Sequence, residues 1–311
     1  MEIITELDNY KISNSVVTIG TFDGIHVGHL EIINVLKAKA KELNLKSVVI
    51  TFYPHPRTVL ANNYDIRLLT PLDEKKKVFS NLNIDCLYII NFTKEFSNKT
   101  YKEFFDEIIV NKIKAKHLVI GYDHKFGKNR DGDINKLGEY IKENELTMSI
   151  VGPEQIDDEI ISSTKIRNAL LDGNIEGANL MLGRNYSLDG IVVEGSKRGR
   201  ELGFPTANLG LADNNKLVPK NGVYFVKANV EGNNYFGVAN VGLRPTFNNT
   251  TVPITEVFIL DFNKDIYGKE IVLEFVKRIR DEIKFDSREI LELQIKKDVE
   301  TAKNFIKENY K

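Results

Sequence analysis

A short strand, a glycine-rich turn and a helix follow one another near the N-terminus, and this pattern restricts the fold more than any other. Val16–Ile19 has the composition of a buried strand, and apolar residues at helical spacing begin directly after His29. Gly20, Gly24 and Gly28 lie in between and allow a tight turn. At the mouth of such a helix, unpaired backbone N–H groups and the helix dipole form a binding site for phosphate.

The same turn carries two histidines in the order His-x-Gly-His. His26 and His29 are about one helical turn apart, so both imidazoles can donate hydrogen bonds to charge that develops on one phosphoryl oxygen. A surface loop whose histidines have no role is the alternative. The sequence contains no G-x-x-x-x-G-K-[ST] motif, so a Walker-type P-loop is excluded. We predict His26 and His29 as catalytic residues, with phosphate contacts from Gly20, Phe22, Asp23 and Gly28.

Composition limits the classes of function. A chain of 311 residues is long enough for two domains with separate cores, and its net charge of −1 favours neither nucleic acid nor anionic membranes. The single cysteine, Cys86, excludes an internal disulfide and a cysteine-based zinc site. The longest apolar run, Cys86–Ile90, is too short to span a bilayer, and the N-terminal segment lacks the apolar core of a signal peptide. We expect a cytoplasmic protein with small-molecule partners and no nucleic-acid or membrane partner, in an oligomeric state that the sequence leaves open.

The first half of the chain alternates between strand and helix patterns. This alternation is typical of an α/β domain with a mostly parallel sheet and helices on both faces, where ligands bind at the carboxyl ends of the strands. The predicted strands are Val16–Ile19, Ser47–Phe52, Cys86–Asn91, His117–Gly121 and Met148–Val151, and the predicted helices start after His29, start at Thr70-Pro71, and cover Thr100–Val110 and Asn135–Asn144.

From about Tyr186 the pattern changes to β. A run of antiparallel strands closed by one helix, with Asp286 as its N-cap, predicts a small antiparallel barrel. The domain boundary is placed between 183 and 184, giving domains 1–183 and 184–311. The predicted strands are Asp189–Glu194, Val223–Val230, Tyr235–Val241, Thr255–Asp261 and Ile271–Lys277, with a hairpin turn at Glu231–Asn234.

Three further segments of the first half follow strand ends or open a helix. A loop with acidic, basic and aromatic side chains suits a planar polar ligand. Serine and threonine at a helix start are also ordinary caps, but a nearby lysine and arginine favour a second phosphate clamp. The candidates are His55 between two prolines, Asp123 and Phe126 in the 121–127 loop, and Ser163, Thr164 and Arg167 in the sequence I-S-S-T-K-I-R.

The densest motif of the second half is a glycine-rich segment followed by Pro-Thr-Ala-Asn. Spaced glycines let backbone N–H groups surround a phosphate, although most such segments are simply tight turns. Thr206 and Asn208 offer neutral oxygen ligands of the kind that Mg²⁺ accepts beside phosphate oxygens. The predicted ATP and phosphate contacts of this half are Gly195, Lys197, Gly199, Gly203, Pro205, Thr206 and Asn208.

Together these motifs resemble a known pair of enzymes. G-T-F-D-G-I-H-V-G-H, the proline-flanked histidine, the 121–127 loop and I-S-S-T-K-I-R resemble bacterial FAD synthetase in order and spacing over roughly residues 15–183. That enzyme is the adenylyltransferase half of the bifunctional riboflavin kinase/FMN adenylyltransferase family. Pro-Thr-Ala-Asn after Gly-Phe is similar to the riboflavin kinase signature. One departure is His124-Lys125, which stands where many relatives have a phenylalanine and a variable residue.

The resemblance implies a nucleotidyltransferase-type, Rossmann-like first domain and a riboflavin kinase-like barrel. It implies that the second domain phosphorylates riboflavin with Mg²⁺-ATP, and that the first transfers an adenylyl group from ATP to FMN, giving FAD and pyrophosphate. Thr206 and Asn208 are then the metal ligands. Glu256 is the implied general base toward the ribityl 5′-hydroxyl, although a lone glutamate on that strand can also simply face water. The implied flavin contacts are His55, Asp123, Phe126, Arg280 and Phe285.

Two other functions stay open. One is a His-x-Gly-His adenylyltransferase that acts on another phosphate, such as nicotinamide mononucleotide or phosphopantetheine. Such an enzyme has no need of an attached flavin kinase, so the Pro-Thr-Ala-Asn half disfavours it. The other is a non-catalytic flavin-binding or flavin-sensing protein on the same scaffold, which would not require His26, His29 and Glu256.

Overall fold

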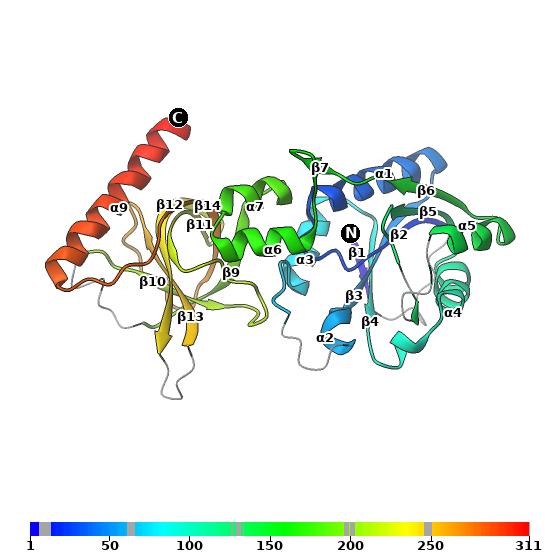
Figure 1. Cartoon of the computed structure of the whole chain (residues 1–311), viewed down its shortest axis with the longest axis horizontal. Coiled ribbons are helices and arrows are strands. Elements are labelled where there is room, and N and C mark those ends of the chain that lie inside the picture. The colour runs from blue at the N-terminus through cyan, green and yellow to red at the C-terminus, as the bar shows by residue number, and fades with distance from the viewer. Residues whose placement is uncertain are drawn as a thin grey trace. The chain divides into compact units, whose positions relative to one another are not determined.

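The computed structural model divides into two compact units, Met1–Ser163 and Thr164–Lys311, which are described separately (Figure 1). Two of the predicted site residues, Phe126 and Lys197, lie outside the described part of the chain. The structure describes residues 1–5, 14–60, 66–125, 127–128, 132, 134–195, 199, 203–245 and 251–310.

The first unit is built on a six-stranded sheet in which every neighbouring pair is parallel. This confirms the predicted α/β class. The order across the sheet is β1-β4-β3-β2-β5-β6. The strands are β1 Glu2–Ile4, β2 Ser15–Ile19, β3 Lys46–Tyr53, β4 Cys86–Asn91, β5 Ala115–Gly121 and β6 Thr147–Val151.

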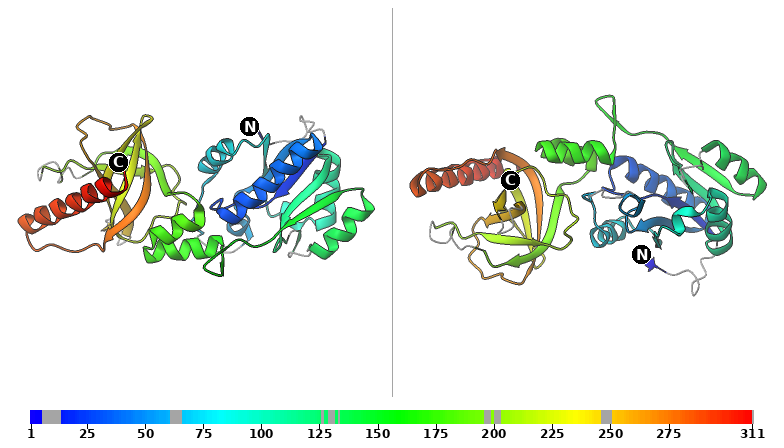
Figure 2. Two further views of the ribbon diagram at one scale, coloured as in Figure 1. Left: turned by 90° about the horizontal axis from the view of Figure 1, so that it is seen from above. Right: turned by 60° about the horizontal axis from the view of Figure 1, so that its bottom comes forward.

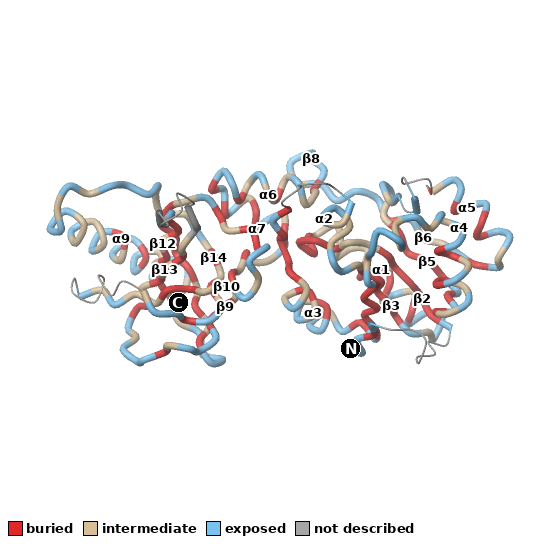
Figure 3. Tube along the Cα trace, turned by 90° about the horizontal axis from the view of Figure 1, so that it is seen from below, coloured by how far each residue is buried: buried red, intermediate tan, exposed pale blue. Residues whose placement is uncertain are grey.

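Helices cover both faces of this sheet, so its central strands are buried along most of their length (Figures 2 and 3). In β3, Val48 and Ile50 pack into one core cluster and Val49 into the other, as the two-residue period of a strand requires. Helices α1 Val27–Leu43 and α3 Leu72–Asn81 cover one face; α4 Tyr101–Phe104, the π-helical segment Phe105–Lys112 and α5 Ile134–Glu143 cover the other. The unit also contains α2 Pro56–Leu60, a 3₁₀ turn at Phe96–Asn98 and the hairpin of β7 Gln155–Ile156 and β8 Glu159–Ile160.

The strand order places a topological switch point beside β2. The chain proceeds from β2 through β3 to β4 on one side, and then returns to β5 on the other side of β2. In open parallel sheets, ligands bind at the carboxyl ends of the strands where the order reverses. The turn after β2 and the loop after β5 both start at this edge.

Three helix predictions need correction. Helix α1 starts at Val27, so His29 lies within the helix and not before it. Helix α3 starts at Leu72 with Pro71 in the N-cap position, one residue later than predicted. The helix predicted over Thr100–Val110 begins as α4, with a capping box between Thr100 and Glu103, but continues with the wider hydrogen bonding of a π-helix. The helix predicted over Asn135–Asn144 is confirmed by α5.

The second unit contains a closed antiparallel barrel in the order β10-β13-β12-β11-β14-β9. The predicted barrel with a closing helix is therefore confirmed. The barrel strands are β9 Tyr186–Val193, β10 Ala207–Leu211, β11 Gly222–Val230, β12 Asn233–Pro245, β13 Thr251–Ile259 and β14 Glu270–Arg280. The second unit also contains the helices α6 Ser163–Asp172 (whose first residue belongs to the first unit), α7 Ile175–Leu182 and α9 Arg288–Asn309.

Helix α9 covers part of the outside of the barrel. Ala302 is fully buried there and belongs to one core cluster with Phe225 and Leu260. The N-cap of α9 is Ser287, whose hydroxyl accepts a hydrogen bond from the backbone N–H of Ile290, so the prediction of Asp286 was wrong by one residue. The boundary predicted between 183 and 184 stays a prediction.

Candidate active sites

The turn after β2 has an unusual backbone. Phe22 and Ile25 have φ values of 45° and 43°, and Gly24 has φ 94°. Only the glycine adopts this left-handed region without cost. A Cβ at Gly20 would come 3.1 Å from the Phe22 ring, so this glycine makes room for the ring. A Cβ at Gly28 would make only ordinary van der Waals contacts with the His26 ring. The phosphate contact predicted for Gly28 stays a prediction.

This turn brings the two predicted catalytic histidines together. His26 occupies the N-cap position of α1, and His29 lies in the first turn of the helix. Their rings stack with centroids 3.7 Å apart, and Phe22 contacts His29 edge-on at 5.2 Å. His26 is buried and His29 is half-buried. The mouth of α1 thus combines helix N–H groups with two imidazoles, an arrangement suited to a phosphate group.

Two predicted phosphate contacts have partners within the protein. The carboxylate of Asp23 accepts hydrogen bonds from the backbone N–H groups of Leu69 (3.3 Å) and Thr70 (2.9 Å). The Ser163 hydroxyl donates to the backbone carbonyl of Asp23 at 2.8 Å. Both side chains therefore fix the shape of the turn, and their contact with phosphate stays a prediction. Thr164 and Arg167 lie on α6 in the second unit.

The predicted flavin contacts of the first unit follow the two strands beside β2. His55 comes directly after β3, and its Nδ1 accepts a hydrogen bond from the backbone N–H of Arg57 at 3.1 Å. Asp123 is exposed in the loop after β5. Because β2 lies between β3 and β5, these side chains start from neighbouring strand ends at the same edge as the histidines.

The second unit places the predicted base and metal ligands together. Thr206 Oγ1 lies 3.5 Å from Glu256 Oε2, and Glu256 is paired in register with Asn208 on β10. Glu256 is also paired with Asn240 on β12, a residue that sequence reasoning did not select. Directly opposite residues of neighbouring strands point to the same face, so these side chains form one polar row.

Two glycines of the glycine-rich segment, Gly195 and Gly199, lie close to this row. A Cβ at Gly195 would come within 2.0 Å of the Asn208 amide, and one at Gly199 would come 2.4 Å from the Phe204 carbonyl. Position 199 therefore requires glycine, because the close atom belongs to the backbone, whereas a side chain at position 195 would displace the Asn208 amide. The requirement at Gly203 comes from its φ of 80°. The oxygen donors of Thr206, Asn208 and Glu256 fit a hard divalent cation that also takes phosphate oxygens.

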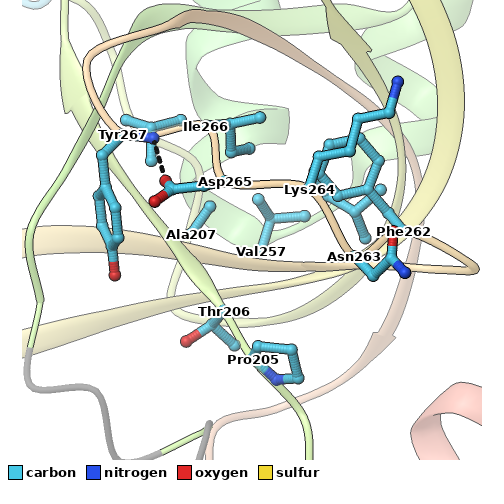
Figure 4. A pocket seen from close by; sticks show the side chains of 12 residues that line it. Pro205, Thr206, Ala207, Val257, Phe262, Asn263, Lys264, Asp265, Ile266 and Tyr267 are labelled. Atoms are coloured by element: carbon cyan, nitrogen blue, oxygen red, sulfur yellow. Dashed lines mark hydrogen bonds between the residues drawn. The ribbon is translucent and has the colours of Figure 1, made fainter.

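A cavity of about 360 Å³ opens next to Thr206. Pro205 and Thr206 lie on one side of it and the loop 262–267 on the other (Figure 4). Its walls combine apolar side chains, such as Val257 and Phe262, with the polar groups of Asn263, Lys264 and Asp265, as small-molecule sites do. Sequence reasoning did not select this loop as part of a site.

Arg280 lies farther along the same barrel face. Val223 is paired in register with both Asn240 and Arg280, which places Arg280 in the row of Glu256. Its guanidinium makes a two-pronged ion pair with the buried Asp298 of α9, with N–O distances of 2.9 and 2.7 Å. The ring of Phe285 lies 5.8 Å from the guanidinium. The predicted flavin contacts of Arg280 and Phe285 stay predictions, but the two residues are adjacent.

Two other kinds of site are absent from the described part of the chain. Among the described residues, no three His, Cys, Asp or Glu side chains gather in a way that would hold a metal ion. Within the same described ranges, no helix has the length and apolar character needed to cross a membrane.

Comparison with known proteins assigns a family to each half. The FAD synthetase family model matches residues 8–165, and the riboflavin kinase family model matches residues 182–306. A crystal structure titled as a macrolide-efflux protein from Streptococcus pneumoniae is 36% identical, with a TM-score of 0.89 over 97% of this chain and 98% of that chain. That title names a different activity for a protein of the same fold.

Curated relatives match the two halves in one polypeptide. The bifunctional riboflavin kinase/FMN adenylyltransferase of Bacillus subtilis is 40% identical, and the match covers 93% of this chain and 92% of the relative. The protein of the same name from Listeria monocytogenes is 37% identical over 96% of this chain and 94% of the relative. With both family models matched in the same order, the chain belongs to the bifunctional riboflavin kinase/FMN adenylyltransferase family.

Proposed function

We propose that this chain makes FAD from riboflavin in two ATP-dependent steps, each at its own site. The barrel phosphorylates riboflavin to FMN, and the α/β domain adenylylates FMN. The observation that carries the proposal is the pairing of sites on one chain: two stacked imidazoles at the mouth of α1, and Thr206 within 3.5 Å of Glu256 beside a nucleotide-sized cavity.

In the barrel, Glu256 accepts the proton of the ribityl 5′-hydroxyl. The hydroxyl oxygen then forms a bond to the γ-phosphorus while the bond between that phosphorus and the β,γ-bridging oxygen breaks, leaving FMN and ADP. Thr206 and Asn208 would hold a divalent cation, which we propose to be Mg²⁺ and which would neutralise phosphate charge when bound. The cavity lined by Thr206 and the loop 262–267 receives the adenosine of ATP.

The flavin ring extends along the row toward Arg280. Arg280 lies on β14, three strands from Glu256 on β13 in the closed barrel. We propose that riboflavin binds with its hydroxyl end at Glu256 and its ring near Phe285. Asn240 lies between the two ends and can hydrogen-bond the ribityl chain.

In the α/β domain, a phosphate oxygen of FMN attacks the α-phosphorus of a second ATP. The new P–O bond forms as the bond to the pyrophosphate oxygen breaks, giving FAD and pyrophosphate. Because this nucleophile is already anionic, no general base is needed. The site must align the reactants and stabilise charge on the α-phosphate, and we propose that His26, His29 and the N–H groups of α1 do so; the stacking of the two rings at the start of α1 supports this. His55 and Asp123 are the proposed flavin contacts.

Incubating the purified protein with riboflavin and Mg²⁺-ATP, and separating the flavins by chromatography, tests the proposal. We expect FMN to appear first and FAD to follow. Riboflavin that is bound tightly but left unchanged would favour a flavin sensor. Adenylylation of nicotinamide mononucleotide or phosphopantetheine in place of FMN would favour the other adenylyltransferase. We also propose a cytoplasmic location for the chain.

A further inference from the structure

The strained turn after β2 needs support from its surroundings. A residue with a side chain in the left-handed region costs roughly 1–2 kcal/mol, and this turn contains two, Phe22 and Ile25, on either side of Gly24. Such a backbone persists only where neighbouring groups hold it in place.

A buried lysine on α3 provides part of this support. Lys75 is 5% exposed, and its Nζ donates a hydrogen bond of 2.6 Å to the backbone carbonyl of Thr21. The Thr51 hydroxyl of β3 donates to the same carbonyl at 3.2 Å and lies 3.4 Å from Nζ. The start of the turn is therefore held from two neighbouring elements.

A second set of hydrogen bonds joins the turn to the segment before α3. Asp23, two residues after Thr21, accepts hydrogen bonds from the N–H groups of Leu69 and Thr70, just before α3 begins. In both sets of hydrogen bonds the turn supplies the acceptor, and α3 or the segment that precedes it supplies the donors. Lys75 carries a positive charge and Asp23 a negative charge, and the two charges attract each other.

The position of Thr21 matters for the histidines through its neighbour. The Phe22 ring contacts His29 at 5.2 Å on one side and Phe79 of α3 at 5.6 Å on the other, both edge-on. His29 in turn stacks on His26. A shift of the Thr21–Phe22 backbone would therefore move the ring that fixes the imidazole pair.

We infer that Lys75 is a positioning residue for adenylyl transfer, which sets the two imidazoles by holding the Thr21 carbonyl and balancing Asp23. This inference rests on the proposed function of the α/β domain. Lys75 acts through the turn, and nothing in the geometry requires it to touch a substrate.

The charge of Lys75 titrates within an accessible range. Burial lowers the pKa of Lys75 to about 8, and the nearby Asp23 offsets only part of this effect. The charged group is present below pH 8 and is lost above it, so support for the turn weakens as the pH rises. The titratable groups of the turn itself are Asp23, His26 and His29.

This titration can be told apart from unfolding. Between about pH 8 and 10.5, the unfolded chain keeps a proton on Lys75 that the folded protein has lost. Stability therefore does not fall in this range on account of Lys75, because the state that binds more protons is disfavoured as the pH rises. A loss of adenylylation activity in this pH range, at an unchanged melting temperature, would therefore report a shift of the imidazole pair and not unfolding.

The test compares K75M and K75R with the wild-type protein, using both activities of the full chain. In K75M we expect kcat/KM for FMN adenylylation to fall roughly 10- to 100-fold at pH 7, while riboflavin phosphorylation stays within twofold. K75R keeps a donor and a charge that does not titrate below pH 12, and should recover part of the activity. The matched control is K37M, because Lys37 also donates to a backbone carbonyl of the same unit, that of Leu82, at 2.7 Å, but away from the turn.

The pH profile provides a second measurement that needs no folded K75M. In the wild-type protein, the ratio of adenylylation to phosphorylation should fall above pH 8, and in K75R it should stay level. Adenylylation by a folded K75M within twofold of wild type, or an identical ratio profile in wild type and K75R, would overturn the inference alone. Failure of the wild-type protein to form FAD from FMN would contradict the proposed function itself.

Discussion

The sequence alone leaves the role of Glu256 open, because side chains alternate between the two faces of its strand and a lone glutamate there can face water. The structure places it between Asn208 and Asn240 in one row and within 3.5 Å of Thr206. A carboxylate that is half-buried among neutral polar groups, beside the proposed cation ligands, is placed to take a proton from a bound hydroxyl.

Removal of this carboxylate should affect only one activity. In Glu256→Gln the side chain keeps its size but no longer accepts a proton, so we expect riboflavin phosphorylation to fall about 10²- to 10⁴-fold. Added FMN should still become FAD at the wild-type rate. The control is Glu270→Gln, at the exposed start of β14, which should leave both rates unchanged. Steady-state rates with each flavin, measured separately, check this; a parallel loss of both activities would contradict separate sites.

His29 supports the reverse prediction. The ring lies between Phe22 and His26 at the mouth of α1, where it can stabilise charge on the α-phosphate. His29→Ala should lower FMN adenylylation about 10²- to 10³-fold, which is typical for the loss of one such donor. Riboflavin phosphorylation by the same preparation serves as the internal control. A variant that still makes FAD from FMN at a near-normal rate would remove His29 from the catalytic group.

At the scale of elements, the strands and helices that carry a bounded apolar run or a chemical motif were predictable from the sequence. Elements that depend on tertiary packing were not. The buried strands of the sheet were found because their apolar runs are bounded by turn residues. The three-residue β1 has no such run, and it forms by pairing with β4. Likewise, the π-helical segment after α4 has no local signal, because packing on the sheet decides its hydrogen bonding.

The site residues likewise divide into those that the sequence predicts and those that only the folded structure shows. Pro-Thr-Ala-Asn and His-x-Gly-His were recognisable because their chemistry is contiguous in sequence. Lys75 was missed because it stands in the charged run Asp73–Lys77, which has the composition of a solvent-exposed helix. Only the four-residue spacing to the buried Phe79 places it on the inner stripe of α3. The loop 262–267 was missed because its contribution is a wall built by tertiary folding.

The ion pair of Arg280 with Asp298 should anchor α9 to the barrel. Asp298 is 4% exposed and also accepts a hydrogen bond from Gln294. Asp298→Asn leaves the Arg280 charge without its counterion, so we expect the free energy of unfolding to fall by about 3 kcal/mol. If Arg280 positions Phe285, the KM for riboflavin should rise as well. Urea unfolding monitored by circular dichroism and steady-state kinetics measure the two effects.

The matched control for this prediction is Asp281→Asn. Asp281 pairs with Arg278 at a similar distance of 2.7 Å, but its side chain is 75% exposed. Solvent screens such a pair, so the midpoint of unfolding should hardly move. Equal effects of the two substitutions would show that burial of the Asp298 pair contributes nothing to the attachment of α9.

At the scale of the whole molecule, two separate cores let one chain carry two sites. Each unit has its own sheet or barrel, and the described site residues group with one or the other. The segment between the two family matches was predicted to belong to the first domain. The residues of α6 from Thr164 and the whole of α7 belong structurally to the second unit, although the predicted boundary lies after them.

Several contacts attach α6 and α7 to the barrel. The carbonyl of Leu170 on α6 accepts a hydrogen bond from the N–H of Lys220 at 2.9 Å. On α7, the Asn179 side chain donates to the Phe275 carbonyl at 2.8 Å and accepts from the Tyr186 N–H at 2.7 Å. Apolar side chains of the two helices are almost completely buried: Leu170, Ile175, Ala178 and Leu182.

These contacts predict that residues 164–311 behave better as a fragment than residues 184–311. Burial of Leu170, Ile175 and Leu182 stabilises the unit by about 5 kcal/mol, which is comparable with the whole stability of a small domain. We expect fragment 164–311 to melt cooperatively and to phosphorylate riboflavin. Fragment 184–311 should melt at a markedly lower temperature or aggregate, because the barrel surface under α7 becomes exposed. Calorimetry and the flavin assay compare the two directly, and equal melting temperatures would instead support the boundary predicted between 183 and 184.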